Sequence, residues 1–309
     1  MRNTFAEEIT NLAKTDKRVV LLSGDIGNKL FDKFKEVDPE RFHNCGIAEA
    51  NMMSMAAGLT MSGLRAIVYT ITPFTTTRCF EQIRVDVCYH SAAVIIVGTG
   101  AGLSYADLGP THHSLEDLAI LRTLPGMRIL APCDSTELKL ALREALRENT
   151  PVYIRIGKKG EPKIHKTDPE FRIGKSIVVH SGKDITIIVA GTIMPEVLAA
   201  SAKLAELGIS AEVVSMHTIK PLDDKYLLAA SEKFKLIVTV EEHGLIGGLS
   251  GAIAEWRALN NIIVPQLAFG TPDEFMHEVG SQEYARAKYG LTGDSIFSKI
   301  NERYKKIMG

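Results

Sequence analysis

Apolar segments of strand length alternate with segments of helix length along most of this chain. The segment 92–98 (AAVIIVG) is apolar throughout, and the segments 18–23 (RVVLLS) and 185–190 (ITIIVA) are mostly apolar. Continuous apolar runs of this length are typical of parallel strands that helices cover on both faces. The alternation therefore predicts an α/β protein built from doubly wound sheets.

A polar stretch interrupts this alternation near the middle of the chain. Residues 157–172 (GKKGEPKIHKTDPEFR) contain two glycines and two prolines, which favour turns over helices and strands. We therefore predict two doubly wound α/β domains, 1–160 and 173–309, joined by a linker at 161–172. The length of 309 residues agrees with two domains of about 150 residues each.

The hydrophobic periodicity also predicts the individual elements of both domains. Strands are expected at 18–23, 65–71, 92–98, 128–131, 152–156, 185–190, 211–215, 236–240 and 262–267. Helices are expected at 4–14, 48–62, 76–90, 114–123, 135–148, 195–207, 223–232, 248–259, 282–289 and 293–304.

Charge and composition exclude several classes of function. The net charge of −1 gives no basic field for nucleic acid or an anionic membrane. The four cysteines are scattered without a C-x-x-C motif, which favours a reduced compartment. No apolar run is long enough to span a bilayer, and the first residues lack the apolar core of a signal peptide. We expect a cytoplasmic protein that binds neither nucleic acid nor membrane.

An acid and two aromatic residues stand out near the second predicted strand. Glu49 lies near the start of a helix made otherwise of small and apolar residues. It is either a first-turn acid favoured by the helix dipole or a buried carboxylate that holds a proton against a ring nitrogen. Phe74 and Phe80 flank the entry to the next helix. They are either core residues or the apolar wall of a site for a heteroaromatic ring.

A loop with an aspartate and two histidines follows the third predicted strand. Residues 106–113 read ADLGPTHH, so Asp107 and His112 lie in a Gly/Pro loop. Loops at the carboxyl ends of parallel strands are where open α/β sheets bind ligands. The alternative is an ordinary surface loop. No Cys, His or carboxylate stands at ligand spacing from the two histidines, so no metal site is predicted in this chain.

The two motifs together resemble the second half of transketolase. Gly-Ile-Ala-Glu at 46–49 matches the site of the cofactor-activating glutamate, and Asp107 followed by Gly-Pro-Thr-His at 109–112 matches the loop of transketolases and deoxyxylulose-phosphate synthases. The resemblance covers almost the whole chain and implies a pyrimidine-binding domain followed by a transketolase C-terminal domain. It also implies thiamine diphosphate as the cofactor.

The resemblance assigns roles to the candidate residues. Glu49 would hydrogen-bond N1′ of the aminopyrimidine of thiamine diphosphate, which would make Glu49 catalytic. Phe74 and Phe80 would pack around that ring, and Asp25 matches an aspartate near the cofactor. His112 and Asp107 would hydrogen-bond hydroxyl groups of the sugar donor. His112 would be a catalytic residue and Asp107 a substrate-binding residue.

Several positions depart from the usual transketolase pattern. The segment Asp-Leu-Gly-Pro-Thr-His is one residue longer than usual, which is expected to displace Asp107. Arg78 matches an arginine of deoxyxylulose-phosphate synthases, and Lys158 stands where transketolases carry a phosphate-binding arginine. A further phosphate-binding position falls near Thr99, which carries no charge. We assign Arg78 and Lys158 to substrate binding.

Full-length transketolases carry a diphosphate- and magnesium-binding domain before these two domains. The resemblance therefore implies the small subunit of a split, two-gene transketolase. It would self-associate to a dimer and join an N-terminal subunit in an α₂β₂ complex, with Mg²⁺ bound mainly by that partner. The complex would transfer a two-carbon ketol unit from a ketose, or its phosphate, to an aldose. The single chain would be inactive.

Three other functions stay open at this point. The beta subunit of a 2-oxoacid dehydrogenase has similar length and domain order, but the Gly-Pro-Thr-His segment argues against it. Arg78 supports an enzyme similar to deoxyxylulose-phosphate synthase. A degenerate partner that only stabilises a dimer is the third, and the retention of Glu49, Asp107 and His112 argues against it.

Overall fold

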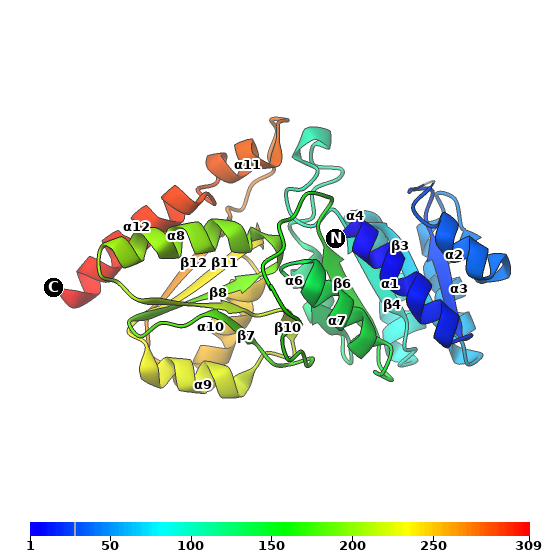
Figure 1. The fold of residues 1–309 in the computed structure, drawn as a ribbon, viewed down its shortest axis with the longest axis horizontal. Coiled ribbons are helices and arrows are strands. Elements are labelled where there is room, and N and C mark those ends of the chain that lie inside the picture. Colours follow the sequence, from blue (N-terminus) through cyan, green and yellow to red (C-terminus); the bar gives the residue numbers. More distant parts are fainter. Residues whose placement is uncertain (28) are drawn as a thin grey trace.

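The computed structural model describes residues 1–27 and 29–309, which form two α/β units side by side (Figure 1). The first sheet has seven strands in the order β10-β5-β6-β4-β3-β1-β2, and the second has five in the order β12-β11-β8-β9-β7. Neighbouring strands are parallel except β10 beside β5 and β7 beside β9. The prediction of two doubly wound α/β units is confirmed.

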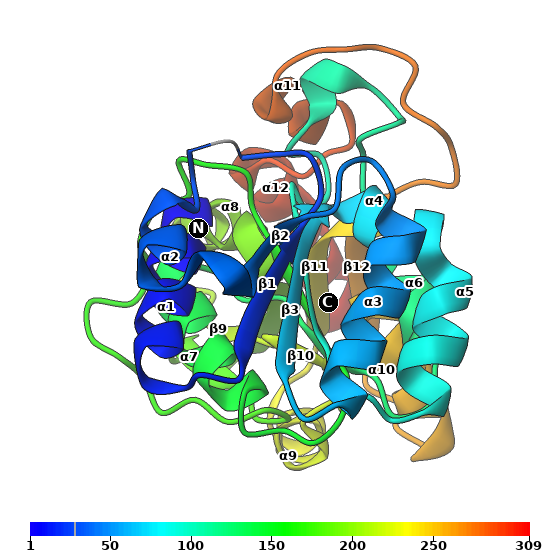
Figure 2. The ribbon, with the colours of Figure 1, turned by 90° about the vertical axis from the view of Figure 1, so that its right-hand side faces the viewer.

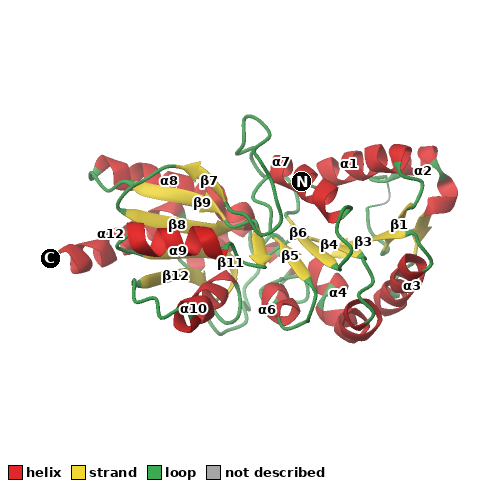
Figure 3. Ribbon diagram, turned by 90° about the horizontal axis from the view of Figure 1, so that it is seen from below, coloured by secondary structure: helices red, strands yellow, loops and turns green. Residues whose placement is uncertain are grey.

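The strands of the first sheet come from both halves of the sequence. They are β1 (Val19–Ser23), β2 (Phe42–Asn44), β3 (Arg65–Ile71), β4 (Ile95–Thr99), β5 (Arg128–Leu130), β6 (Val152–Ile156) and β10 (Thr218–Lys220). The second sheet contains β7 (Ile177–His180), β8 (Ile185–Ala190), β9 (Ala211–Ser215), β11 (Ile237–Gly244) and β12 (Gln266–Thr271). β10 comes from the second half of the chain but pairs with β5 at the edge of the first sheet. It therefore links the two sheets, which lie next to each other (Figure 3).

Helices cover both faces of each sheet. In the first half they are α1 (Arg2–Thr15), α2 (Asp32–Val37), α3 (Glu49–Met61), α4 (Thr72–Thr75), α5 (Phe80–Gln82), α6 (Asp117–Arg122) and α7 (Ser135–Ala145). In the second half they are α8 (Met194–Glu206), α9 (Asp224–Lys233), α10 (Leu249–Leu259), α11 (Gln282–Lys288) and α12 (Gly293–Met308). Figure 2 shows α1 and α2 on one side of the first sheet and α3 and α5 on the other.

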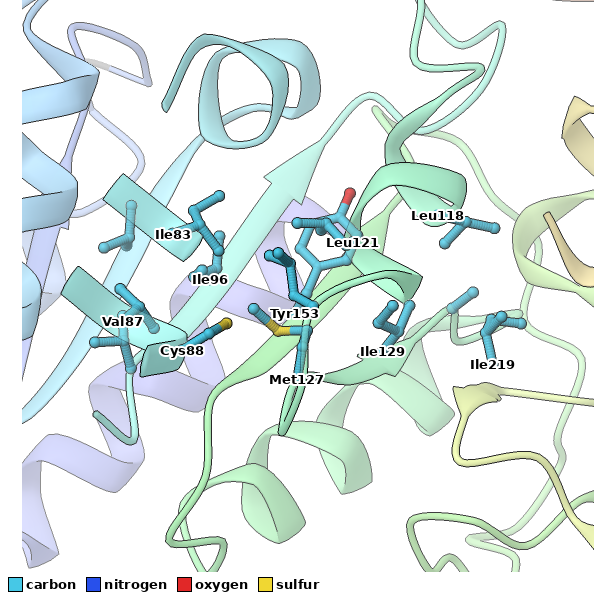
Figure 4. Packing of buried hydrophobic residues seen from close by; sticks show 14 of the residues in the cluster. Ile83, Val87, Cys88, Ile96, Leu118, Leu121, Met127, Ile129, Tyr153 and Ile219 are labelled. Carbon is cyan, nitrogen blue, oxygen red and sulfur yellow. The ribbon is translucent and has the colours of Figure 1, made fainter. Parts of the chain in front are cut away.

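Three apolar clusters fill the spaces between these layers. One lies between the first sheet and α1 and α7, and another lies between the second sheet and α8 and α12. The largest lies under α3 and α6 and continues to α9 and α10, so that it belongs to both sheets. Figure 4 shows part of it, where Ile83, Ile96, Leu121, Met127 and Tyr153 point toward one another. This shared core fixes one sheet against the other.

Several predicted elements are shifted at their ends, such as the strand expected at 92–98 and found at Ile95–Thr99, and two predicted elements differ from the structure more strongly. The helix expected at 76–90 is broken into a 3₁₀ turn (Thr77–Cys79), the short α5 and a π-helix (Ile83–Tyr89). The strand expected at 262–267 begins only at Gln266, because Pro265 has no N–H for a ladder hydrogen bond. The apolar residues before it lie outside the sheet, and Ile263 is exposed.

Short elements escaped prediction altogether. They are the helices α2 and α4 and the strands β2, β7 and β10, each six residues or fewer. Within the described residues, the segment between β6 and β7 contains neither helix nor strand. Among the same residues, no helix has the length and apolar character needed to cross a bilayer.

Candidate functional site

Most of the candidate residues follow strands of one parallel array. Glu49 opens α3 shortly after β2, Phe74 lies in α4 directly after β3, and Lys158 follows β6 by two residues. Asp107 and His112 lie in the loop after β4. Because β6, β4, β3, β1 and β2 are parallel neighbours, all their carboxyl ends meet at one edge of the sheet. This edge is where such sheets bind ligands.

Glu49 is a buried carboxylate and not a solvated first-turn acid. Its exposed fraction is 4%, and its Oε2 accepts a hydrogen bond of 3.0 Å from Nη1 of Arg78. The guanidinium carbon of Arg78 also lies 4.0 Å from the centroid of the Phe74 ring. A planar cation thus lies on an aromatic face while it donates to a buried carboxylate. The pair of Glu49 and Phe74 can therefore bind a flat nitrogen base.

His112 lies against the same aromatic ring. The His112 and Phe74 ring centroids are 5.3 Å apart in an edge-to-face arrangement, and Nδ1 of His112 lies 2.9 Å from Oγ1 of Thr111. Burial lowers the pKa of the His112 imidazole below its usual value, and the positive charge of Arg78 adds to this effect while Asp107 opposes it. A lowered pKa favours the neutral ring at neutral pH, in which one nitrogen accepts and the other donates a hydrogen bond.

Asp107 and Lys158 form an ion pair at the outer side of this group. Nζ of Lys158 lies 3.2 Å from Oδ1 and 3.5 Å from Oδ2 of Asp107, and 4.3 Å from the centroid of the Tyr105 ring. The Tyr105 ring centroid is 6.0 Å from that of His112. A continuous row of contacts therefore runs from Glu49 to Asp107, with aromatic rings between charged groups.

The remaining candidate residues are Arg78, Phe80 and Asp25. Arg78, assigned to substrate, contacts Glu49 and Phe74, which were assigned to the cofactor. Phe80 is half-buried at the start of α5 and packs against the largest core cluster. Asp25 is exposed after β1, where its Oδ1 accepts a hydrogen bond from Asn44. Within the described residues, no hydrogen bond or ring contact joins Phe80 or Asp25 to Glu49.

Two further features were missed by the sequence reasoning. Tyr105 connects Lys158 to His112, and its place two residues before Asp107 was the available signal. The second is a buried ion pair of 2.8 Å between Nε of Arg155 and Oδ2 of Asp117. Nη2 of Arg155 also donates to the carbonyl oxygens of Ser114 and Glu242. Arg155 interrupts an otherwise apolar strand, which could have revealed it.

The buried ion pair holds the loop that carries His112. Ser114 follows that loop, and its carbonyl oxygen lies 2.6 Å from Arg155 on β6. Glu242 belongs to β11 of the second sheet, and its carbonyl oxygen lies 2.8 Å from the same guanidinium nitrogen. One arginine therefore connects the end of the loop to both sheets.

Comparison with known proteins assigns both halves of the chain to known domains. Residues 1–162 match the transketolase pyrimidine-binding domain and residues 174–296 match the transketolase C-terminal domain. The chain is 37% identical to one of the subunits of apulose-4-phosphate transketolase from Phocaeicola vulgatus, over 99% of this chain and 97% of that protein. It is 35% identical to the 6-deoxy-6-sulfo-D-fructose transketolase subunit SqwH of Clostridium sp. (strain MSTE9), over 98% and 94%.

A solved structure is similar over the same length. It is described as a split gene transketolase in an inactive beta4 tetramer, and it is 32% identical with a TM-score of 0.89. The similarity covers 98% of this chain and 97% of that one. The chain is also 32% identical to 1-deoxy-D-xylulose-5-phosphate synthase of Caldanaerobacter subterraneus subsp. tengcongensis, where it spans 49% of the longer protein.

Proposed function

We propose that this chain, which belongs to the transketolase family, acts as the C-terminal subunit of a split transketolase and uses thiamine diphosphate to transfer a two-carbon ketol unit from a ketose to an aldose. The observation that carries the proposal is the buried carboxylate of Glu49 beside the face of Phe74. A flat guanidinium bridges these two side chains, so the same carboxylate and ring face suit a flat aminopyrimidine whose ring nitrogen shares a proton with Glu49.

The residues of the site have distinct tasks in this proposal. When bound, thiamine diphosphate supplies the nucleophilic carbon for the reaction. Glu49 holds a proton at a ring nitrogen of the aminopyrimidine, and Phe74 provides an apolar face for that ring. Nδ1 of His112 pairs with Thr111, so His112 can use Nε2 to donate to, or accept from, one sugar hydroxyl. The exposed carboxylate of Asp107 accepts from a further hydroxyl of the donor.

A second protein chain is part of the proposal. The similar proteins from Phocaeicola vulgatus and Clostridium sp. are named as subunits, which supports a division of the enzyme between two chains. We propose an α₂β₂ complex in which the partner binds the diphosphate and provides most of the Mg²⁺ coordination.

The proposal is tested with the chain alone and with a subunit that carries a diphosphate-binding domain. Both samples receive thiamine diphosphate, Mg²⁺ and a panel of ketoses and aldoses with and without phosphate. We expect the chain alone to be folded and inactive, and the mixture to transfer a two-carbon unit. Transfer by the chain alone would contradict the need for a partner. A mixture that binds the cofactor but transfers nothing would contradict the enzyme function.

A hollow beside Lys158 suggests where a substrate phosphate binds. Its volume is about 370 Å³, and it is lined by Ser104, Asp107, Lys158, Lys159, Gly280, Ser281 and Gln282. Two lysines, two hydroxyls and an amide suit a phosphate group, and the volume is within the range of small-molecule sites of about 300–1,000 Å³. Lys158 is paired with Asp107, so it can bind a phosphate only if its ammonium contacts both groups or breaks the contact with Asp107.

We expect Lys158→Ala to raise KM for a phosphorylated sugar more than it lowers kcat. Loss of one charge-assisted contact costs about 1.5–3 kcal/mol, or roughly one to two decades in kcat/KM. Sugars without phosphate should be nearly unaffected. The matched control is Lys166→Ala, an exposed lysine of the same segment outside the hollow. Equal losses on both substrate types would mean that Lys158 shapes the site through Asp107 instead of binding phosphate.

A further inference from the structure

Three side chains with metal-binding atoms meet at the carboxyl end of β5. Cys133 lies between β5 and α7, Glu137 lies in the first turn of α7, and His165 comes from the segment between β6 and β7. One ligand atom from each residue, Sγ, a carboxylate oxygen and a ring nitrogen, lies within 4.8 Å of the other two. Cys133 and Glu137 are fully buried. We propose that Cys133, Glu137 and His165 form a binding site for one zinc ion.

Two of the three distances between ligand atoms are close to those that zinc requires, and the third, between Cys133 and Glu137, is within 4.8 Å. Nε2 of His165 lies 3.9 Å from Sγ of Cys133 and 2.9 Å from Oε1 of Glu137. Bonds of about 2.3 Å to sulfur and about 2.0 Å to nitrogen or oxygen place tetrahedral ligands roughly 3.3–3.6 Å apart. The sulfur approaches by about 0.3 Å and the His165–Glu137 contact opens by about 0.4 Å to meet this geometry. Both changes are within the reach of side-chain rotation.

Neighbouring groups already orient the proposed ligands. Oε2 of Glu137 accepts from the backbone N–H of Cys133 at 2.8 Å and from Oγ of Ser215 at 3.0 Å, which leaves Oε1 facing His165. Oδ2 of Asp134 accepts hydrogen bonds from the backbone N–H groups of Ile164 and His165 and so fixes the segment that carries the imidazole. Such outer contacts are a regular feature of metal sites, because they hold each ligand in one orientation.

Charge and donor type favour zinc at this place. A thiolate, a carboxylate and a neutral imidazole carry two negative charges, so one divalent ion makes a buried site neutral. Sulfur and nitrogen donors suit Zn²⁺ better than Mg²⁺ or Ca²⁺, which prefer oxygen. The fourth position is open to water or to His217, which lies between β9 and β10. His217, whose buried Nε2 has no hydrogen-bond partner among the described residues, follows Ser215 by two positions.

The zinc site is separate from the proposed cofactor site. Cys133 and Glu137 follow β5, whereas Glu49 and Phe74 follow β2 and β3, with β6 and β4 between β5 and β3 in the sheet. The ion would join the segment that carries His165 to the residues that follow β5 of the first sheet. The hydrogen bond from Ser215 to Glu137 connects the same site to β9 of the second sheet. Its function is therefore structural, at the junction of the two sheets.

The test uses the full chain, stripped of metal and free of thiamine diphosphate, titrated with Co²⁺ alone. We expect one Co²⁺ per chain, with a thiolate-to-cobalt charge-transfer band and tetrahedral visible bands, both removed by an equivalent of Zn²⁺. Cys133→Ser should abolish the thiolate band. His165→Gln, which alters a less buried position, should weaken Co²⁺ binding by more than the roughly 10–100-fold typical of outer-shell changes.

The matched control is Cys88→Ser, which removes another buried thiol, on the π-helix, and should keep the wild-type spectrum. A wild-type chain without a thiolate band at stoichiometric Co²⁺ would overturn the proposal and leave a hydrogen-bonded cluster of His165 and Glu137. A band of full intensity in Cys133→Ser would overturn the ligand assignment. Both outcomes are independent of ketol transfer, because no substrate or cofactor is present.

Discussion

Replacement of Glu49 by Gln is expected to preserve the fold and the assembly of the complex but to lower kcat by about 10²–10⁴-fold, the scale of a general acid–base contribution. Glu49 is buried, so its charge acts at short range on any group bound beside Phe74. Gln has the same shape and can still accept a hydrogen bond. It cannot hold a proton against a ring nitrogen, so the chemical step should suffer and binding should change little.

Hydrogen–deuterium exchange at C2 of bound thiamine diphosphate measures this effect without a sugar substrate. In the assembled complex, exchange should slow in Glu49→Gln by a factor similar to that in kcat. The matched control is Glu81→Gln, which alters the exposed first-turn acid of α5 and should exchange at the wild-type rate. If Glu49→Gln also exchanges at that rate, Glu49 has no part in cofactor activation.

The sequence predicted the fully buried strands of five or more residues well, because burial on both faces leaves a continuous apolar run. The strands Arg65–Ile71 and Val152–Ile156 have the predicted bounds, and all their residues are buried. The helical segment 76–90 was less predictable, because its break into a 3₁₀ turn and a π-helix depends on packing against α3. The shift of β12 to Gln266 was available in the sequence, since Pro265 marks its start.

The contacts of the site depend on strand order, which periodicity does not reveal. Lys158 meets Asp107 because β6 pairs with β4, although β5 lies between them in the sequence. The contact of Arg78 with Glu49 depends on how a broken helix directs a long side chain. The proposed zinc ligands were hidden for a related reason, because His165 lies 28 residues from Glu137. Linear spacing finds only ligands that are close in the chain.

Replacement of Arg155 by Met is expected to lower the free energy of unfolding by about 3–5 kcal/mol, as for other buried ion pairs that lose one partner. Arg155 and Asp117 are each 2% exposed. Without the guanidinium, the contacts that the Asp117 carboxylate keeps among the described residues are the 2.6 Å hydrogen bond from the Tyr153 hydroxyl and the His243 ring nitrogen 4.0 Å away. Burial and the charge of Asp117 raise the pKa of Tyr153 well above its usual value, so that hydroxyl stays protonated and continues to donate.

The midpoint of urea unfolding of the full chain measures the loss. Arg84→Met is the matched control, because Arg84 is 54% exposed in its pair with Glu81 and such pairs contribute at most about 1 kcal/mol. The double variant Arg155→Met with Asp117→Leu removes both charges, so it should be more stable than Arg155→Met alone. A double variant no more stable than the single one would show that the two carbonyl oxygens of Ser114 and Glu242, left without a donor, dominate the cost. In that case Arg155 acts as a tether of the His112 loop, and its charge is secondary.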